Sequence, residues 1–288
     1  MTEYPEVEIL MATYNGERYI SEQLDSILNQ TYNNWHLTVR DDGSSDDTVN
    51  ILKKYLLIHP EKISIIETNN KNLGPCDNFA LLLEKSKADY IMFSDQDDVW
   101  LRNKIEISIK KMLEIEATYP NKPIVVHTDL IVADSKLNTI SESMLRYHRL
   151  YSKISCPLEL LLMNNITGCT MCINKKAREI SIPIPKNAFM HDLWIGVKTM
   201  QKGGKICFID LPLVKYRQHT SNYAGVEKAE TSVYYIHMLK SPIKSFFRFL
   251  NGYNKVKEQA DLANEKFDIC RFMWLKIYIL IKRLFYSI

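Results

Sequence analysis

The sequence predicts an α/β fold in which a mostly parallel sheet is flanked by helices. Short apolar runs rich in β-branched residues alternate with segments of helical period, and polar clusters follow the ends of several of these runs. The connections are short, as repeated strand–helix–strand units require. With 288 residues, the chain is long enough for one large domain and an appendage.

The first hundred residues carry the clearest alternation. Val7–Thr13 is the first expected strand, and Ile20, Leu24, Ile27 and Leu28 then fall on one side of an amphipathic helix. The elements expected next are strands at Leu37–Arg40, Ile63–Glu67 and Tyr90–Ser94 and helices near Thr48–Ile58 and Asn78–Glu84. This order predicts parallel strands joined by helical crossovers.

The pattern is more mixed beyond Trp100. The expected helices lie near Lys104–Ala117, Leu158–Met163 and Leu193–Met200, and the expected strands near Ile124–His127, Thr170–Ile173, Ile206–Ile209 and Val214–Arg217. We expect this half to cover the sheet and to complete a ligand site.

Three polar clusters directly follow expected strands. They are Thr13-Tyr14-Asn15-Gly16, Asp41-Asp42-Gly43-Ser44 and Asp95-Gln96-Asp97-Asp98. In open α/β sheets, ligands bind in the crevice outside the carboxyl ends of the strands. The three clusters therefore predict one site.

The third cluster places Asp95, Asp97 and Asp98 within four residues. Mutual repulsion makes such a group costly unless a cation neutralises it, and oxygen ligands suit Mg²⁺ or Mn²⁺, which would in turn bridge phosphates. The alternative is a solvated turn in which Asp97 or Asp98 caps the next helix. The position at the ligand edge favours a divalent cation.

The second cluster divides into two parts. Asp46 and Asp47 are best interpreted as the start of the helix near Thr48–Ile58. Asp41 and Asp42 lie nearer the strand end, where a carboxylate accepts hydrogen bonds from a base N–H or from ribose hydroxyls. These two residues are candidates for nucleotide contact.

Two later segments add candidate polar groups. Asp192 opens an expected helix in His191-Asp192-Leu193-Trp194, where it is either an N-cap or a general base. Arg217 and His219 follow the last expected strand, where they would offer a guanidinium and an imidazole to a diphosphate or a metal. A lone histidine is more often structural, so both interpretations stay open.

Several function classes lack their signatures. The chain has nine glycines but no Gly-x-Gly and no phosphate-binding P-loop, which disfavours dehydrogenases and kinases. It has no His-Glu-x-x-His and no Gly-x-Ser-x-Gly. Six cysteines in so long a chain indicate a reducing, cytoplasmic setting, and Cys169-Thr-Met-Cys172 lacks the second pair of a zinc site. The net charge of +3 gives no reason to expect a nucleic-acid partner.

The motifs, taken together and in order, resemble the inverting family 2 glycosyltransferases of the GT-A fold, and more narrowly their bacterial rhamnosyltransferase-like branch. The resemblance spans about residues 5–225 and rests on the three clusters above, with the third continuing to Trp100, and on His191-Asp192-Leu-Trp194 and Tyr216-Arg217-Gln218-His219-x-x-Asn222. It implies a catalytic domain over residues 1–225 and a helical C-terminal region over 226–288.

The resemblance also implies residue roles. Asp192 would be the catalytic base, and Asp97, Asp95 and His219 would hold a divalent cation, Mg²⁺ or Mn²⁺. The nucleotide-sugar would contact Ala12, Thr13, Tyr14, Asn15, Asp42, Asp95, Arg217 and Asn222. The acceptor and the donor sugar would lie near Asp98, Trp100, Gly168, Cys169, His191 and Trp194.

The implied reaction is sugar transfer with inversion from a nucleoside-diphosphate donor. The branch favours L-rhamnose from dTDP-rhamnose, with a UDP-hexose as the other choice, and a growing, lipid-linked bacterial surface polysaccharide as acceptor. The Gln-x-x-Arg-Trp of processive synthases is replaced by Tyr-Arg-Gln-His, which argues for one sugar per encounter. Two alternatives are a sugar nucleotidyltransferase, whose usual Gly-rich loop is missing, and an inactive glycan- or nucleotide-binding scaffold.

The C-terminal segment is basic and amphipathic. From Lys240 onward there are ten Lys or Arg and four Asp or Glu, a net charge of +6, against −3 for the rest. On a helical wheel of residues 271–288, Arg271, Lys276, Lys282 and Arg283 share one arc and the opposite arc is apolar. We expect a peripheral helix on the inner face of the cell membrane. The alternative is a helix packed on the catalytic domain or on another subunit.

Overall fold

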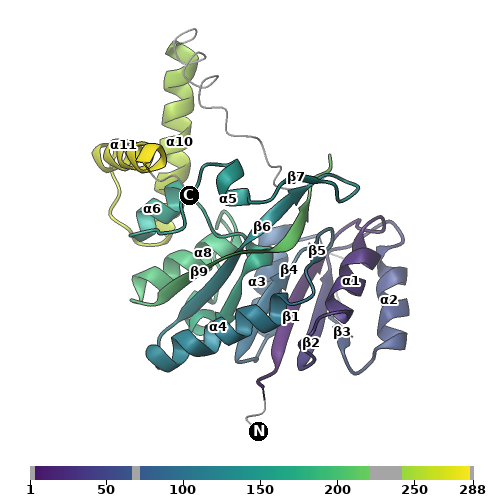
Figure 1. The fold of residues 1–288 in the computed structure, drawn as a ribbon. Helices are drawn as coiled ribbons and strands as arrows, with labels where there is room; N and C mark the ends of the chain where they lie inside the picture. The colour runs from purple at the N-terminus through teal and green to yellow at the C-terminus, as the bar shows by residue number, and fades with distance from the viewer. Residues whose placement is uncertain (1–3, 67–71, 221–241, 286–288) are drawn as a thin grey trace.

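A computed structural model describes residues 4–66, 72–220 and 242–285 of the chain. It confirms the predicted class, since a mostly parallel sheet has helices on both faces (Figure 1). Within the described residues the sheet has the order β3-β2-β1-β4-β8-β6-β9-β5, with β7 paired to β6. The strands are β1 (Val7–Thr13), β2 (Trp35–Asp41), β3 (Ile63–Ile65), β4 (Tyr90–Ser94), β5 (Val99–Trp100), β6 (Ile124–Ala133), β7 (Thr139–Ser141), β8 (Cys172–Asn174) and β9 (Lys205–Arg217).

The parallel part of the sheet brings three strand ends together. β1 pairs in parallel with β2 and β4, and Val7 lies opposite Trp35 on one side and Tyr90 on the other. The three strands therefore start level and run in the same direction. Their carboxyl ends, which the polar clusters follow, lie at one edge.

Two sets of helices cover the two faces. The first face carries α1 (Ile20–Leu28), α2 (Thr48–Ile58) and α4 (Lys104–Thr118), and the second carries α3 (Pro75–Lys85), α7 (Lys175–Ser181) and α8 (His191–Gln201). Alternate residues of β1 pack into the two cores: Ile9 and Met11 into the first and Leu10 into the second. Burial on both faces explains why residues 9–12 of this strand are all apolar.

One predicted strand, Thr170–Ile173, is wrong in its first half. Gly168–Thr170 forms a 3₁₀ turn, and β8 begins only at Cys172. The turn forms because the Thr170 and Met171 N–H groups donate to the carbonyls of Thr167 and Gly168, at 2.9 Å each. The 3₁₀ turn contacts β4, β6 and β9 just before β8 begins.

A second correction concerns the end of the sheet. The two strands predicted at Ile206–Ile209 and Val214–Arg217 are one strand, β9. Pro212, which cannot donate to a ladder, lies within this strand. The pairing with β6 instead shifts register around Asp129, which lies opposite Pro212, so the strand continues.

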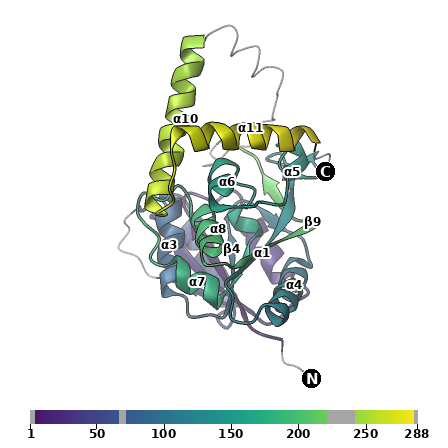
Figure 2. The same cartoon turned by 90° about the vertical axis from the view of Figure 1, so that its left-hand side faces the viewer.

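The C-terminal helices pack on a small helix of the second half. α5 (Met144–Tyr147) and α6 (Pro157–Leu162) precede the Gly168 turn, and α10 (Pro242–Leu262) and α11 (Ile269–Phe285) close over α6. Leu158 of α6, Ala260 of α10 and Phe272 of α11 belong to one apolar cluster. Figure 2 shows α11 lying across this end of the molecule and crossing the direction of α10. Among the described helices none is long and apolar enough to span a membrane.

Candidate active site

The site begins where β1 and β2 end side by side. Thr13 and Asp41 are register partners, and the Thr13 hydroxyl donates to Asp41 Oδ1 at 2.9 Å. Asp41 Oδ2 accepts from the backbone N–H groups of Gly43 and Ser44, at 3.0 and 2.8 Å. The Asp41 carboxylate therefore shapes the loop that follows β2.

The loop after β1 is tied to the loop after β2. Asn15 has a φ of 48°, a left-handed conformation that asparagine tolerates better than most residues. Its N–H donates to Ser44 Oγ and its Oδ1 accepts from the Ser45 N–H, both at 2.8 Å, while the Gly16 N–H donates to Thr48 Oγ1. The Asn15 side chain thus fixes the edge of the site. Contact between Asn15 and a nucleotide stays a prediction.

Tyr14 is the aromatic residue among the predicted nucleotide contacts, and it is exposed. Its side chain is 49% exposed at the mouth formed by these loops. An exposed aromatic face at a strand edge is suited to stack on a base. Ala12, two residues earlier in β1, is half-buried and packs against the second core.

Gln96 is a site residue that the sequence analysis did not single out. Its Oε1 accepts from the Tyr14 N–H and its Nε2 donates to the Tyr14 carbonyl, both at 2.8 Å. A Cβ on Gly16 would lie 2.2 Å from Gln96 Oε1, so any larger residue there would displace the Gln96 side chain. Gln96 therefore clamps the third cluster to the first. The only sequence signal was its place between the aspartates.

Asp42 is buried beneath this edge. Its carboxylate pairs with Arg40 Nη1 at 2.6 Å and accepts from the N–H groups of Leu73 and Gly74 at 2.8 Å. These bonds hold the turn that precedes α3. In the structure the Asp42 carboxylate is thus bonded to protein groups. Its contact with a base or ribose stays a prediction.

The three aspartates after β4 lie in different environments. Asp95 and Asp97 are partly exposed, whereas Asp98 is buried. Burial, followed by the charges of Asp97 and Asp192, raises the pKa of Asp95 to about 7. The Cys169 sulfur lies within 4.8 Å of carboxylate oxygens of Asp95 and Asp98, and the adjacent Gly168 N–H donates to Asp192, so two motifs almost a hundred residues apart meet in one site.

Asp97 and His219, two of the predicted metal ligands, are in direct contact. Asp97 Oδ2 lies 2.8 Å from His219 Nε2, and the imidazole stacks on Tyr19 with ring centroids 4.7 Å apart. Two adjacent ligands of an octahedral Mg²⁺ at ~2.1 Å lie roughly 3 Å from each other. Asp97 and His219 are therefore at chelating distance with little movement, and the residues fit a divalent cation.

A second group of ligand atoms lies behind this pair. Carboxylate oxygens of Asp95 and Asp98 and the Cys169 sulfur lie within 4.8 Å of one another. Burial and the charges of Asp98 and Asp95 raise the pKa of the Cys169 thiol well above its usual value, which keeps it protonated. Hard cations prefer oxygen to a neutral thiol. The thiol is therefore the poorest ligand of this group, and a cation held by Asp95, Asp97 and His219 stays a prediction.

Asp98 faces the protein. Its Oδ1 accepts from the Arg217 N–H at 3.2 Å, and burial, then the charges of Asp97 and Asp95, raise its pKa well above the usual range. The alternative in which Asp97 or Asp98 caps the next helix is wrong, because β5 follows the cluster and the residue before α4 is Asn103.

Arg217 links the aspartate loop to the rest of the site. Its Nε donates to the Asp97 carbonyl at 2.7 Å and its Nη1 to the Ser135 carbonyl at 2.9 Å. The guanidinium also pairs with Glu22 and lies over the Tyr19 ring, 4.6 Å from the centroid. The side chain is almost fully buried, so Arg217 holds the backbone of Asp97 in place. Its predicted contact with a diphosphate stays a prediction.

Asp192 lies in the first turn of α8 and faces the Gly168 turn. Its Oδ2 accepts from the Gly168 N–H at 2.9 Å and its Oδ1 from the Leu193 N–H at 2.6 Å. Burial raises its pKa to about 6, although these two hydrogen bonds lower it. The N-cap alternative is wrong, because Met190 occupies the cap position. The side chain is held rigid and titrates near neutral pH, as a general base requires.

The aromatic and imidazole groups predicted on the acceptor side are core residues in the structure. His191 stacks on Phe79 and Phe93, with ring centroids 4.2 and 4.9 Å apart, and burial lowers its pKa to about 3. Trp100 is buried, and the Trp194 indole donates to the Ser181 carbonyl at 2.9 Å. Sugar contact by these side chains stays a prediction.

Gly168 and Asn222 are the last two predicted site residues. A Cβ on Gly168 would lie 2.7 Å from His191 Nε2, so a glycine lets the turn approach α8 and reach Asp192. Asn222 lies outside the described residues.

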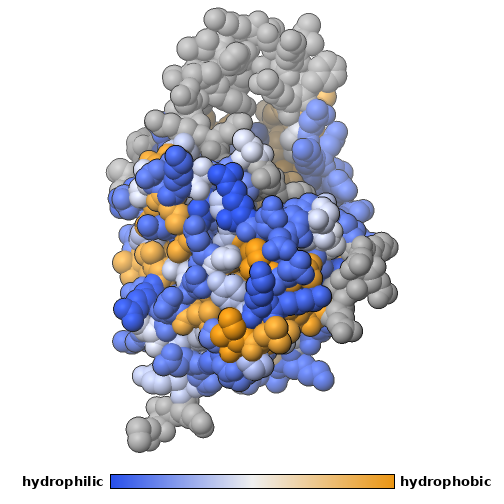
Figure 3. Space-filling view, turned by 90° about the vertical axis from the view of Figure 1, so that its right-hand side faces the viewer, coloured by the Kyte–Doolittle hydropathy of each residue, from blue (hydrophilic) through white to orange (hydrophobic). Residues whose placement is uncertain are grey.

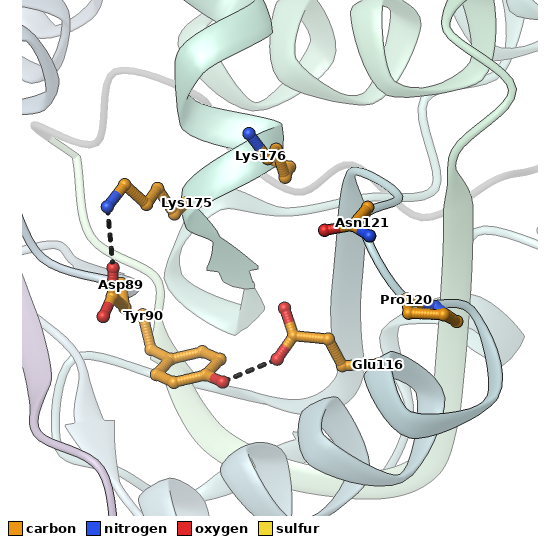
Figure 4. A pocket seen from close by; sticks show the side chains of 7 residues that line it. All are labelled: Asp89, Tyr90, Glu116, Pro120, Asn121, Lys175 and Lys176. Carbon is orange, nitrogen blue, oxygen red and sulfur yellow. Dashed lines mark hydrogen bonds and ion pairs between the residues drawn. The ribbon is translucent and has the colours of Figure 1, made fainter.

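A separate polar pocket lies at the opposite end of β4. It is lined by Asp89, Tyr90, Glu116, Pro120, Asn121, Lys175 and Lys176 (Figure 4). The Tyr90 hydroxyl donates to Glu116 Oε2 at 2.6 Å, and Lys175 pairs with Asp89 at 3.3 Å. Tyr90 starts β4 and Asp95 follows its end, so the strand separates this pocket from the aspartate site.

Comparisons with known proteins agree with this geometry. Residues 8–190 match the model of the family described as "Glycosyl transferase family 2". A Shigella flexneri relative, described as dTDP-rhamnosyl transferase RfbG, is 30% identical over 75% of this chain and 73% of its own. An Escherichia coli relative, described as UDP-Glc:alpha-D-GlcNAc-diphosphoundecaprenol beta-1,3-glucosyltransferase WfgD, is 36% identical over 43% of this chain and 49% of its own.

Solved structures match the fold over nearly the whole chain. Residues 1–349 of S. aureus TarS in complex with UDP align with a TM-score of 0.59 and 15% identity, covering 98% of this chain and 72% of that one. The mannosyltransferase PcManGT of Pyrobaculum calidifontis, in complex with GDP-Man and Mn²⁺, aligns with a TM-score of 0.55 and 15% identity, covering 98% and 81%. At these identities the match concerns the fold, which is the GT-A fold.

Proposed function

The chain belongs to glycosyltransferase family 2, and we propose that it transfers one sugar with inversion from a nucleoside-diphosphate donor to an acceptor hydroxyl. The buried carboxylate of Asp192, held by backbone N–H groups near the aspartates that follow β4, is the observation on which this rests. Asp192 is held by two backbone N–H groups, and its negative charge contributes to the raised pKa of Asp95. This arrangement separates the proton acceptor from the group that would hold the diphosphate.

In the proposed reaction, Asp192 takes the proton of the acceptor hydroxyl as its oxygen attacks the anomeric carbon. The bond from that carbon to the nucleoside diphosphate breaks on the opposite face, so the configuration inverts. A pKa near 6 leaves Asp192 ionised at neutral pH and still basic enough to accept a proton as it leaves the hydroxyl. The Gly168 N–H orients the carboxylate during this step.

The leaving diphosphate is proposed to lie against Asp95, Asp97 and His219. A divalent cation bound there, Mg²⁺ or Mn²⁺, would neutralise the charge that builds on the diphosphate, so that no protein acid is needed. Asp97 and His219 lie at chelating distance, and Arg217 keeps the Asp97 backbone in place. PcManGT, which has the same fold, is described in complex with Mn²⁺.

We propose dTDP-L-rhamnose as the donor, and a UDP-hexose as the alternative. The name of the Shigella flexneri relative supports the first and the name of the Escherichia coli relative supports the second. The exposed Tyr14 ring and the loop held by Gln96 would receive the base.

The proposed acceptor is a lipid-linked saccharide of a growing bacterial surface polysaccharide, used on the cytoplasmic face of the cell membrane. The Escherichia coli relative is named for a diphosphoundecaprenol-linked acceptor, and a Bacillus subtilis relative for teichuronic acid biosynthesis. A metal-dependent, peripheral membrane enzyme that adds one sugar per encounter fits these names.

The test is a donor panel with configurational analysis. The full chain is incubated with dTDP-rhamnose, UDP-glucose and UDP-N-acetylglucosamine, with synthetic lipid-linked saccharides, with and without Mn²⁺. Mass spectrometry identifies the transferred sugar, and NMR of the product gives its anomeric configuration. An inverted product formed only with Mn²⁺ supports the proposal. A retained configuration, or nucleotide binding without transfer to any acceptor, contradicts it.

A further inference from the structure

Helix α11 presents two different apolar sides. Phe272, Leu275 and Ile279 are buried against α6, α10 and the segment before α6. A second row of apolar residues is exposed, with Trp274 61%, Ile277 56% and Met273 50% accessible. The full row is Ile269, Met273, Trp274, Ile277, Leu280 and Ile281. At about 100° per residue these six share an arc of roughly 140°, which we call the open face of α11.

The charges of α11 all have one sign. The helix contains Arg271, Lys276, Lys282 and Arg283 and no aspartate or glutamate. Arg271 and Lys276 are exposed and lie on opposite sides of the open face in the helical projection. An apolar face bordered by cations is complementary to an anionic bilayer surface, where acyl chains lie beneath negative headgroups. Two copies of the same face would instead bring cations together.

Lys282 fixes the helix to the protein. Lys282 Nζ donates to Glu159 Oε1 of α6 at 3.0 Å and lies over the Tyr151 ring, 4.5 Å from its centroid. The Tyr151 hydroxyl also donates to Glu159 Oε1, at 2.5 Å. Because these bonds hold one side of α11 inward, the open face has a fixed outward direction.

The position of α11 relates the open face to the site. β1, β2 and β4 end toward the side of the molecule on which α10 and α11 lie (Figure 1). α6, which carries Glu159, leads within six residues to Gly168, whose N–H binds Asp192. A surface beneath the open face would therefore lie on the side from which an acceptor reaches Asp192.

We propose that α11 inserts its open face into the headgroup region of an anionic bilayer and so holds the acceptor side of the site at the membrane surface. Only the identity of the acceptor delivered there rests on the proposed function. Binding of the bilayer itself does not require catalysis, so the two can fail independently.

Trp274 provides a direct probe. All four tryptophans lie in the described residues, and Trp35, Trp100 and Trp194 are buried, so only Trp274 changes its surroundings when the open face is covered. With vesicles of phosphatidylcholine and phosphatidylglycerol, we expect a blue shift of the emission and quenching by brominated acyl chains. The Trp274→Phe variant should bind the same vesicles without that signal. Pure phosphatidylcholine vesicles should bind at least about tenfold more weakly, since the cations then lack partners.

A matched pair of double variants separates this face from apolar exposure in general. Leu57 and Ile58 of α2 are 81% and 68% exposed. Figure 3 shows the side of the molecule that carries α1 and α2, where apolar patches interrupt a mainly hydrophilic surface. Trp274→Glu with Ile277→Glu should reduce co-flotation with anionic vesicles at least about tenfold, since each change removes an inserted apolar group. Leu57→Glu with Ile58→Glu should not reduce it. Circular dichroism verifies that both proteins are folded.

The outcomes decide between a membrane and a protein partner. The Asp192→Asn variant should bind vesicles as the unchanged protein does, even if transfer proves not to depend on Asp192. Light scattering without vesicles should show the same mass for the unchanged protein and for the Trp274 and Ile277 double variant. A dimer that dissociates in that variant, or emission of Trp274 unchanged by anionic vesicles, would overturn the proposal.

Discussion

At the scale of single residues, the site separates groups that titrate from groups that only position them. Asp192 is held by the Gly168 and Leu193 N–H groups and has a pKa raised to about 6, mainly by burial. Arg217 and Gln96 act on backbone atoms of the loops that carry Asp97 and Tyr14. Substitutions of the two kinds should therefore affect different kinetic constants.

Asp192→Asn should remove the proposed base while keeping its shape. We expect kcat to fall about 10²- to 10⁴-fold, as for loss of a general base, with donor affinity unchanged. In the unchanged protein, kcat/KM should rise as pH increases through about 6, because Asp192 accepts a proton only in its ionised form. Steady-state kinetics from pH 5 to 8 measure both effects. Near-normal turnover of the asparagine variant would exclude Asp192 as the base.

His219→Ala should weaken the cation site, since it removes one of two ligands at chelating distance. We expect a 10- to 100-fold higher Mn²⁺ concentration for half-maximal activity, about the loss typical of a weakened metal shell. Asp210→Asn, an exposed aspartate on β9, is the matched control and should leave the Mn²⁺ titration unchanged. Equal titration curves for the histidine variant and the control would contradict the assignment.

At the scale of elements, a glycine in a loop and a glycine in a helix should respond to alanine substitution in opposite ways. Gly16→Ala would place a Cβ 2.2 Å from Gln96 Oε1 and force the clamp open. In α10, the nearest atom to a Cβ on Gly252 is Phe272 Cζ, at 4.0 Å. Gly16→Ala should therefore lower stability and raise the KM for the donor. Gly252→Ala should stabilise the protein by about 0.5–1 kcal/mol, since alanine is the better helix former. Denaturant unfolding compares the two, and a Gly16→Ala protein with normal stability and donor KM would refute the clamp.

How much of the fold could be predicted differs between elements. Val7–Thr13 and Tyr90–Ser94 were predicted with the observed bounds, because burial on both faces makes most residues of each strand apolar. β9 was divided in error at Pro212, because its continuity depends on a register shift against β6. Local sequence shows that proline disturbs a ladder, but it does not show the partner strand that accommodates it.

The same distinction holds for the candidate site. The strand-end position of Asp95 and Asp97 followed from the polar cluster after an apolar run, and the family resemblance named Asp192. The clamp of Gln96 on Tyr14 joins residues 82 positions apart, so no local pattern contained it. The resemblance also placed His191 and Trp194 toward a sugar, whereas the structure buries both rings in the core.

At the scale of the whole molecule, two buried histidines and Asp95 give the folding stability opposite dependences on pH. The pKa of His191 is lowered to about 3 and that of His127 to about 4, so the unfolded chain binds their protons more readily and stability rises with pH up to about 6.5. Asp95 has its pKa raised to about 7, so the folded state binds its proton more readily. Its contribution falls as pH rises from about 4 to 7. A pH profile of the unchanged protein alone would mix these effects.

Comparison with the Asp95→Asn variant isolates the carboxylate, because the histidines are common to both proteins. Without divalent cations, the variant should unfold at nearly the same temperature near pH 4 and a few °C higher above pH 7, where only the unchanged protein carries the unfavourable charge. Mn²⁺ should reverse this order above pH 7, since a bound cation stabilises only the protein that retains the ligand. Thermal unfolding at pH 4.5 and 7.5, with and without Mn²⁺, measures all four differences. A cation-free difference that does not grow with pH would show that the charge of Asp95 is already neutralised within the protein.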